Sequence, residues 1–234
     1  DDLVFMREEE KLARDTYLVL GEQWDLTVFF NIAKSEQRHM DALEALLDAF
    51  GIDDPVIDES DVGTFADPTL QDLFDDLTAS GMQSGIDALK VGGLIEETDI
   101  LDLQDAIGRS ENLDVITVYE NLLCGSRNHL RAFVRQIELY GEVYEPELMS
   151  EEALSAIVDF PTERGCGARK QDGNGAGNGS GNGAGNGTRN GAGNGTGNGS
   201  GNDAGNGAGK GTGNGSGHGA GKGTGHGAGK GSGR

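Results

Sequence analysis

Apolar residues recur at three- and four-residue spacing along four long segments of the chain, which is the period of an amphipathic α-helix. The first segment covers residues 2–20, and Gly21 follows it as a stop signal. The second covers residues 27–50 and is closed by Gly51. Because only a few residues separate the two segments, we expect them to pack as an antiparallel helical hairpin.

The same pattern predicts a second hairpin, formed by residues 84–107 and 112–140. Between the hairpins, residues 51–66 are rich in turn-forming residues and predict no regular element. Residues 67–77 begin with Asp-Pro, which is typical of a helix start, and a short acidic helix is expected at 150–158. The two hairpins are therefore joined by a long crossover.

Two helical hairpins with one long crossover are the topology of a ferritin-like four-helix bundle, whereas an up-down-up-down bundle has only short loops. Strand patterns are almost absent from the sequence. We therefore predict an all-α fold in which residues 1–164 form a ferritin-like bundle and residues 165–234 form a separate tail.

The tail differs from the bundle in composition, since residues 165–234 contain 31 of the 41 glycines. Such a segment has little apolar surface to offset its backbone entropy, so we predict a disordered Gly/Asn-rich tail. Calcium-binding repeats are excluded because the only Asp after Asp172 is Asp203. We favour a solvated spacer as the role of the tail. The alternative is that its sparse basic residues contact metal, the acidic domain or an acidic cell surface. These residues are Lys210, His218, Lys222, His226, Lys230 and Arg234.

Charge excludes several partners. The chain has a net charge of −22, and residues 1–164 hold 11 Lys and Arg against 38 Asp and Glu. Such a domain repels nucleic acid and anionic lipid. No apolar run is long enough to span a membrane. The chain begins at Asp1 without Met, which is consistent with a processed form, and we favour a secreted or cell-surface location over the cytoplasm.

The two cysteines carry little signal. Cys124 and Cys166 are too few for a disulfide framework and lack the spacing of a zinc site. We expect Cys124, five residues before His129, to be a packing residue that points away from any ligand.

Polar residues on the apolar stripes are the candidates for chemistry. Each long segment directs at least one potential metal ligand inward: Glu10 on the first, Glu36 and His39 on the second, Glu96 with Glu97 on a neighbouring stripe of the third, and His129 on the fourth. Such groups are costly in a dry core unless something neutralises them, and a pair of divalent metal ions would do so. The Glu-x-x-His spacing of residues 36–39 places an oxygen and a nitrogen donor on one helix face.

The motifs resemble those of a known superfamily. Glu10-x-x-Ala13-x-x-x-Tyr17 and the string SEQRH at 35–39 look like the first two ligand helices of the rubrerythrin and ferritin superfamily. The strings EEEKLARDTY, NIAKSEQRHM, ALKVGGLIEETDILDLQ and YENLLCGSRNHLRAF resemble an uncharacterised ferritin-like family of archaea and bacteria, DUF2202. The resemblance covers residues 3–140. Tyr17 itself is expected to be a packed core tyrosine, and a redox role or a hydrogen bond with a ligand is the alternative.

The resemblance implies a role for each ligand. Glu10 would be a terminal carboxylate, Glu36 a bridge, His39 and His129 terminal imidazoles, and Glu96 or Glu97 the carboxylate of the third helix. It also implies iron, with two ions bound, while manganese and zinc suit the same donors.

One position departs from the superfamily pattern. Three residues before His129, where di-iron relatives have a second bridging Glu, this chain has Ser126. Asp99, one turn beyond Glu96, is the candidate replacement. Without it the site would be mononuclear, weak or selective for another metal. For Glu97 and Asp99 a solvated surface position is the competing interpretation.

Three functions remain open. The first is an oxidase or peroxidase of rubrerythrin type that acts on O2 or peroxide. The second is a non-catalytic secreted or surface bundle that serves as an interaction module tethered by its tail. The third is metal sequestration without turnover. The resemblance also leads us to expect a homodimer.

Overall fold

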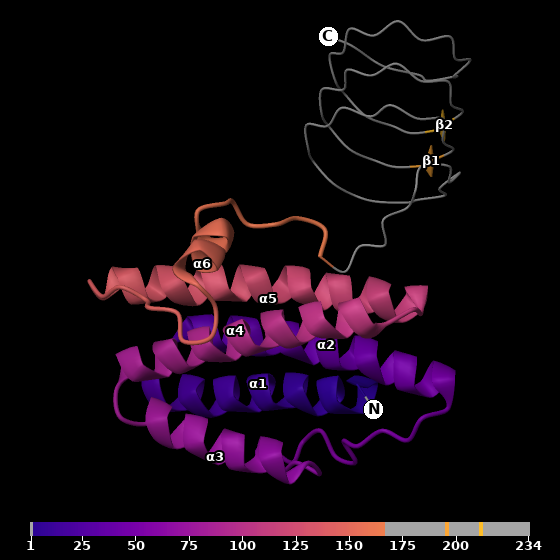
Figure 1. Cartoon of the computed structure of the whole chain (residues 1–234), viewed down its shortest axis with the longest axis horizontal. Helices are drawn as coiled ribbons and strands as arrows, with labels where there is room; N and C mark the ends of the chain where they lie inside the picture. Colours follow the sequence, from indigo (N-terminus) through magenta and orange to yellow (C-terminus); the bar gives the residue numbers. More distant parts are fainter. Residues whose placement is uncertain (1, 167–194, 197–210, 213–234) are drawn as a thin grey trace, which may run out of the picture. The chain divides into compact units, whose positions relative to one another are not determined.

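The computed structural model describes residues 2–166, 195–196 and 211–212. Within residues 2–166 it contains six helices (Figure 1), and these are α1 (Asp2–Trp24), α2 (Thr27–Phe50), α3 (Pro68–Gly81), α4 (Gly85–Arg109), α5 (Leu113–Leu139) and α6 (Glu151–Val158). Four of them are long, and their order along the chain is the predicted one. The all-α prediction is confirmed for this part of the chain.

The long helices pack as the two predicted hairpins. Helix α1 packs along α2, α4 packs along α5, and the two pairs face each other to form the bundle. The crossover between α2 and α4 contains α3, which packs against α1 and α4 on the outside (Figure 1). Helix α6 crosses α5 on the opposite side of the bundle. This is the ferritin-like topology that the sequence predicts.

Local signals set most of the helix ends. Gly51 ends α2 in the left-handed conformation with a φ of 65°, and the side chain of Asp67 accepts a hydrogen bond from the backbone N–H of Thr69 at the start of α3. Ser150 caps α6 in the same way. The stop predicted at Gly21 is wrong, because α1 continues to Trp24.

Gly21 has a packing role. A Cβ at this position would lie 3.0 Å from Cβ of Phe29, so the glycine lets α2 approach α1 closely. Beyond it, the indole Nε1 of Trp24 donates a hydrogen bond of 2.8 Å to the carbonyl of Gly81 and so fastens the end of α1 to the end of α3.

Three buried basic side chains of α1 hold the crossover in place. Arg7 binds the carboxylates of Asp54 and Glu59. Lys11 donates to the carbonyl of residue 61 at 2.8 Å, and Arg14 donates to the backbone carbonyl of Glu59 at 2.7 Å. All three bases are 5% exposed or less, because the crossover covers this polar face of α1.

The core consists of two apolar clusters, one toward each end of the bundle. The larger includes Tyr17, Phe29 and Phe133, and the smaller includes Met6 and Leu103. On each long helix the candidate metal ligands stand between members of the two clusters. The bundle therefore has a polar layer with apolar packing on both sides.

A disulfide, which the sequence analysis did not predict, joins Cys124 on α5 to Cys166. Hydrogen bonds support the segment that carries Cys166. Glu163 accepts from the guanidinium groups of Arg127 and Arg131, and Asn128 bonds the backbone of Glu163. Cysteine number alone gave no sign of this, because the bond forms only when the segment after α6 returns to α5.

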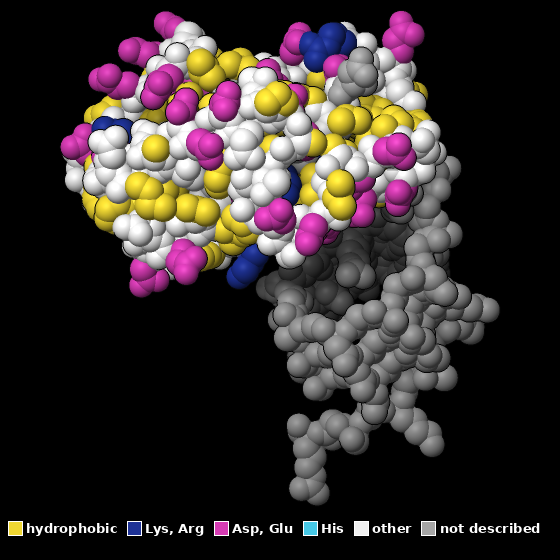
Figure 2. All heavy atoms as spheres, turned by 90° about the horizontal axis from the view of Figure 1, so that it is seen from below, with side chains coloured by type: hydrophobic (Ala, Val, Ile, Leu, Met, Phe, Trp, Pro, Cys, Tyr) yellow, Lys and Arg dark blue, Asp and Glu magenta, His cyan; other side chains and the backbone are white. Residues whose placement is uncertain are grey.

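The chain beyond residue 169 forms a separate unit, of which β1 (Gly195–Thr196) and β2 (Gly211–Thr212) are described and pair in parallel. The predicted disorder of the tail concerns residues that otherwise lie outside the described part. Among described residues, no helix is long and apolar enough to cross a membrane. Figure 2 shows one face of the bundle, on which Asp and Glu side chains are far more frequent than Lys and Arg.

Candidate metal centre

Five predicted ligands from the four long helices meet in the polar layer. Glu10 comes from α1, Glu36 and His39 from α2, Glu96 from α4 and His129 from α5. None of the five is more than 8% exposed. Heptad-like spacing on each helix points these side chains inward, and the hairpin topology brings the four helices to one level.

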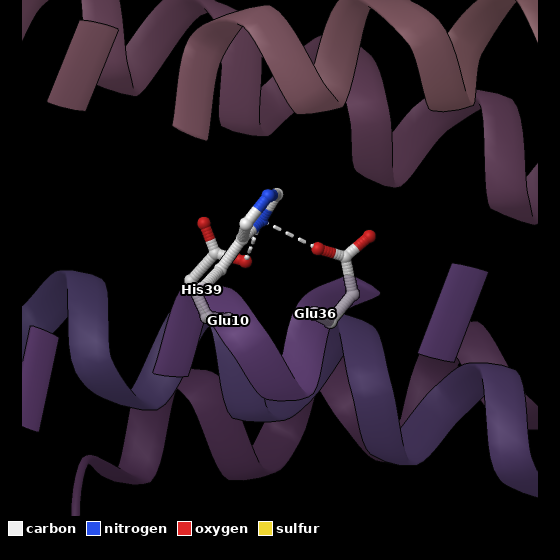
Figure 3. A group of neighbouring side chains, drawn as sticks. All are labelled: Glu10, Glu36 and His39. Atoms are coloured by element: carbon white, nitrogen blue, oxygen red, sulfur yellow. Dashed lines mark hydrogen bonds and ion pairs between the residues drawn. The ribbon is translucent and has the colours of Figure 1, made fainter. Parts of the chain in front are cut away.

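His39 stands between two carboxylates (Figure 3). Its Nδ1 lies 3.0 Å from Oε2 of Glu10 and 2.7 Å from Oε2 of Glu36. The three residues form one group whose potential ligand atoms all lie within 4.8 Å of one another.

His129 forms a second group with the other side of Glu36. Its Nδ1 lies 2.7 Å from Oε1 of Glu36 and 3.5 Å from Oε2 of Glu96. The imidazole rings of His39 and His129 stack with their centroids 5.5 Å apart. Glu36 is thus shared, with one oxygen facing each histidine.

Several polar atoms of this layer make no hydrogen bond within residues 2–166. They are both carboxylate oxygens of Glu36, Oε2 of Glu96 and Nδ1 of His129. The contacts between Glu36 and the two histidines are close ion-pair contacts and not hydrogen bonds. Buried polar atoms that approach one another without hydrogen bonding are costly unless another partner binds them. Carboxylate oxygens and imidazole nitrogens in this arrangement fit divalent transition metal ions.

Burial and mutual charge shift the protonation equilibria of all five groups. Burial raises the pKa of Glu10 and that of Glu96 to about 7, against the opposing charge of the neighbouring histidine. Burial disfavours the imidazolium form of His39 and His129, but the facing carboxylates outweigh it, so the pKa of His39 lies well above its usual value and that of His129 rises to about 10.

Burial also disfavours the carboxylate form of Glu36, but the charges of His129 and His39 outweigh it and lower the pKa of Glu36. The imidazolium forms of the two histidines therefore offset part of the carboxylate charge of the layer. Metal cations would have to replace those protons, because a ligating imidazole must be neutral.

Glu97 does not join the layer. Its carboxylate accepts hydrogen bonds from the hydroxyl of Tyr144 and from the backbone N–H groups of Glu147, Leu148 and Met149. Glu97 thus holds the segment between α5 and α6, and Glu96 is the α4 carboxylate that faces His129.

Asp99 lies close to the layer but outside both groups. It is 3% exposed, so the surface position that we weighed for it is wrong. Burial raises the pKa of Asp99 well above its usual value, and the charges of Glu9, Glu10, Glu96 and Glu36 add to this effect.

Helix α5 contributes only His129 to the layer. Ser126 is buried, and its hydroxyl donates to the carbonyl of Leu122 on its own helix. Gly125 leaves room for a ligand of another helix, since a Cβ there would lie 2.5 Å from Nε2 of His39. Sequence spacing identified Ser126 as a departure but gave no sign of the role of Gly125.

Residues 1–161 match the family model described as "Uncharacterized protein domain (DUF2202)". The chain belongs to this family. It is 50% identical over 165 residues to the uncharacterized protein MJ0754 of Methanocaldococcus jannaschii, which covers 70% of this chain and 89% of the relative. The crystal structure of MJ0754 matches with a TM-score of 0.68 and 49% identity over 69% of this chain and 92% of that chain.

A more distant solved structure supports the fold assignment. It is a two-domain protein of Anabaena variabilis with a DJ-1/ThiJ/PfpI-like and a ferritin-like domain. The match has a TM-score of 0.51 at 14% identity and covers 62% of this chain and 40% of that chain. At this identity the likeness shows the fold alone, and the DUF2202 bundle described above is ferritin-like.

Proposed function

We propose that this DUF2202 protein binds a pair of transition metal ions in the polar layer, iron first among them, and uses them in redox chemistry with O2 or peroxide. The observation that carries the proposal is the position of Glu36, whose two oxygens each lie 2.7 Å from Nδ1 of a different histidine. Glu10 and His39 would hold one ion, Glu96 and His129 the other, and Glu36 both. Manganese and zinc suit the same donors.

The surrounding residues suit such chemistry. Tyr17 donates a hydrogen bond to Glu96 and so fixes the orientation of one ligand. The aromatic rings of Tyr17, Phe29 and Phe133 pack together beside the layer and exclude water from that side. Iron bound there would supply electrons for the reduction of O2 or peroxide.

Metal content tests the proposal directly. Protein purified without an affinity tag would be loaded anaerobically with ferrous ion, freed of excess metal and measured by inductively coupled plasma mass spectrometry. We expect about two ions per chain, as the two ligand groups imply. The double variant His39→Ala/His129→Ala should lose them. The double variant His218→Ala/His226→Ala is the matched control, since it removes two histidines outside the bundle, and it should keep them.

A gentler variant guards against misfolding. Glu36→Gln keeps the size of the side chain while removing its charge, and circular dichroism would show whether the helices persist. A folded Glu36→Gln protein with full metal content would contradict the proposal. Wild-type protein that binds no ferrous ion would leave the bundle as an interaction module.

Turnover distinguishes redox catalysis from sequestration. Absorbance after mixing the ferrous protein with O2 or with peroxide would follow oxidation. Repeated cycles with a reductant show a catalyst, whereas bound iron that is not oxidised shows sequestration.

A further inference from the structure

Three acids of α4 lead from the polar layer toward the surface. Glu96, Asp99 and Asp102 follow one another at three-residue steps, and each step moves about 4.5 Å along a helix and about 60° around it. Their exposure rises in the same order, since Glu96 is fully buried, Asp99 is 3% exposed and Asp102 is half-buried. The series therefore runs from the metal centre to the edge of the bundle.

Helix α1 lines the other side of this series. Glu9, which is 5% exposed, precedes the ligand Glu10, and the side chain of Asp102 lies close enough to raise the pKa of Glu9 together with burial, which is the larger cause. Asp99 lies within reach of the charges of Glu9, Glu10 and Glu96.

A buried hydroxyl adds a second, independent sign of a polar ligand at this edge. Tyr119 on α5 is 1% exposed, and its hydroxyl has no hydrogen-bond partner within residues 2–166. The charges of Asp2, Arg109 and Glu9 act on this hydroxyl, so it lies near Glu9 at the same edge of the bundle. An unpaired buried hydroxyl beside buried carboxylates is costly unless a cation or its hydration shell binds there at some stage.

We propose that Asp102, Glu9 and Asp99 form the access route by which divalent cations reach the metal centre. The route rests on the proposed metal-binding function. No histidine accompanies these acids, and they do not form a close group of the kind that Glu10, Glu36 and His39 form within the described residues. Acids spaced in this way suit the passage of a cation rather than its retention. Arg109 at the end of α4 is paired with Asp2 and Asp105, which balance its charge.

The rate of Co2+ uptake tests the route. Stopped-flow absorbance of the cobalt d–d bands would be recorded at low ionic strength after mixing the metal-free full chain with Co2+. Asp102→Asn should slow uptake about tenfold, and Asp102→Lys should slow it further because a cation then stands at the mouth. The final cobalt stoichiometry should stay as in the wild type, since Asp102 lies outside the ligand groups. Added salt should slow the wild type more than Asp102→Lys.

Asp105→Asn is the matched control. It removes the same charge from the same helix one turn away, at an exposed position, and its uptake rate should stay within about twofold of the wild type. Glu9→Gln is the second variant, and should also slow uptake; thermal melting would confirm that it is folded.

The outcomes separate the route from the metal centre. Cobalt bound as fast by the Asp102 variants as by the wild type would overturn the route and leave the metal centre intact. Reduced stoichiometry in Asp102→Asn would make Asp102 a ligand and would also overturn it. A wild-type chain that takes up no cobalt would remove the proposed function and the route together.

Discussion

The hydroxyl of Tyr17 on α1 donates a hydrogen bond of 2.6 Å to Oε1 of Glu96 on α4. Burial and the charges of Glu96 and Glu36 raise the pKa of Tyr17 well above its usual value, so the hydroxyl stays protonated and keeps its role as donor. The contact spans the two hairpins and leaves the other oxygen of Glu96 directed toward His129. Tyr17 is therefore a positioning residue for the proposed ligand.

Replacing Tyr17 by Phe should weaken both the fold and the metal centre. The change leaves a buried carboxylate oxygen without its donor, so the free energy of unfolding of the metal-free protein should fall by about 1–3 kcal/mol. Metal affinity should fall about 10- to 100-fold, as for other residues that orient a ligand. Urea unfolding and competition with a chelator measure the two effects. Tyr119→Phe is the control, because the hydroxyl of Tyr119 has no hydrogen-bond partner among residues 2–166, and its stability should not fall.

Ser126→Glu should supply the carboxylate that α5 lacks. A further buried acid beside Glu36 and Glu96 raises the cost of the metal-free fold, so its Tm should fall. Bound metal would neutralise the added charge, and affinity should rise at least tenfold, which is about 1.4 kcal/mol. Thermal melting with and without Mn2+ measures both effects. Ser126→Ala is the control and should change little, because the hydroxyl bonds only its own helix. If Mn2+ raised the Tm of Ser126→Glu by no more than it raises the Tm of the wild type, the prediction would be contradicted.

The sequence predicts the fold and the inward faces of the candidate ligands well because both depend on helical period. Glu36 and His39 stand three residues apart on an apolar stripe, and this spacing alone fixes their common face. Glu96 and Glu97 could not be separated in this way, because adjacent residues lie only about 100° apart on a helix. The choice between them depends on Tyr144, which returns to α4 from a loop after α5 and binds Glu97.

Contacts between segments far apart in the chain account for what the sequence did not predict. Gly21 looks like a stop in a one-dimensional pattern, and only the approach of Phe29 shows its packing role. Arg7 looks like a solvated base until the crossover brings Asp54 and Glu59 over it. These relationships follow from tertiary structure, which overrides local propensity.

Gly125→Ala should displace His39. The added methyl group would lie 2.5 Å from Nε2 of the imidazole, so either the ring or α5 must move. We expect a loss of about 1–3 kcal/mol in the free energy of unfolding and a marked loss of metal affinity. Urea unfolding and metal titration measure these effects. The control Gly108→Ala, at an exposed helical position with open space around it, should stabilise the protein by about 0.5–1 kcal/mol.

Acid should loosen the clamp between Arg7 and the crossover. Burial opposes the charge of Glu59, but hydrogen bonds from Arg7 and Gln37 outweigh it and lower the pKa of Glu59. A lowered carboxyl pKa contributes stability above the unfolded value of about 4.5, and this contribution is lost as the pH falls through the folded value. Arg7→Met should lower the free energy of unfolding by about 1.5–3 kcal/mol at pH 7, and by less below pH 4.5.

Urea unfolding of wild type and Arg7→Met between pH 7 and pH 3.5 checks this dependence. Arg109→Met is the control, because Arg109 is exposed and pairs with Asp2 and Asp105 at the surface. Arg109→Met should lower the free energy of unfolding by less than about 1 kcal/mol. If the difference in the free energy of unfolding between wild type and Arg7→Met grew as the pH fell, the prediction would be contradicted.

The disulfide between Cys124 and Cys166 should stabilise the end of the domain. The bond closes a loop with a sequence separation of 42, for which the chain-entropy relation gives about 4 kcal/mol. Glu163 would still be held by Arg127 after reduction, so we expect the bundle to stay folded with a lower Tm. Thermal melting with and without a reductant measures the change, and Cys124→Ser/Cys166→Ser should melt like the reduced wild type under both conditions. A reductant that lowers the Tm of the double Ser variant as much as that of the wild type would show that the effect does not come from this bond. Mass spectrometry of the unreduced protein checks that the bond is present.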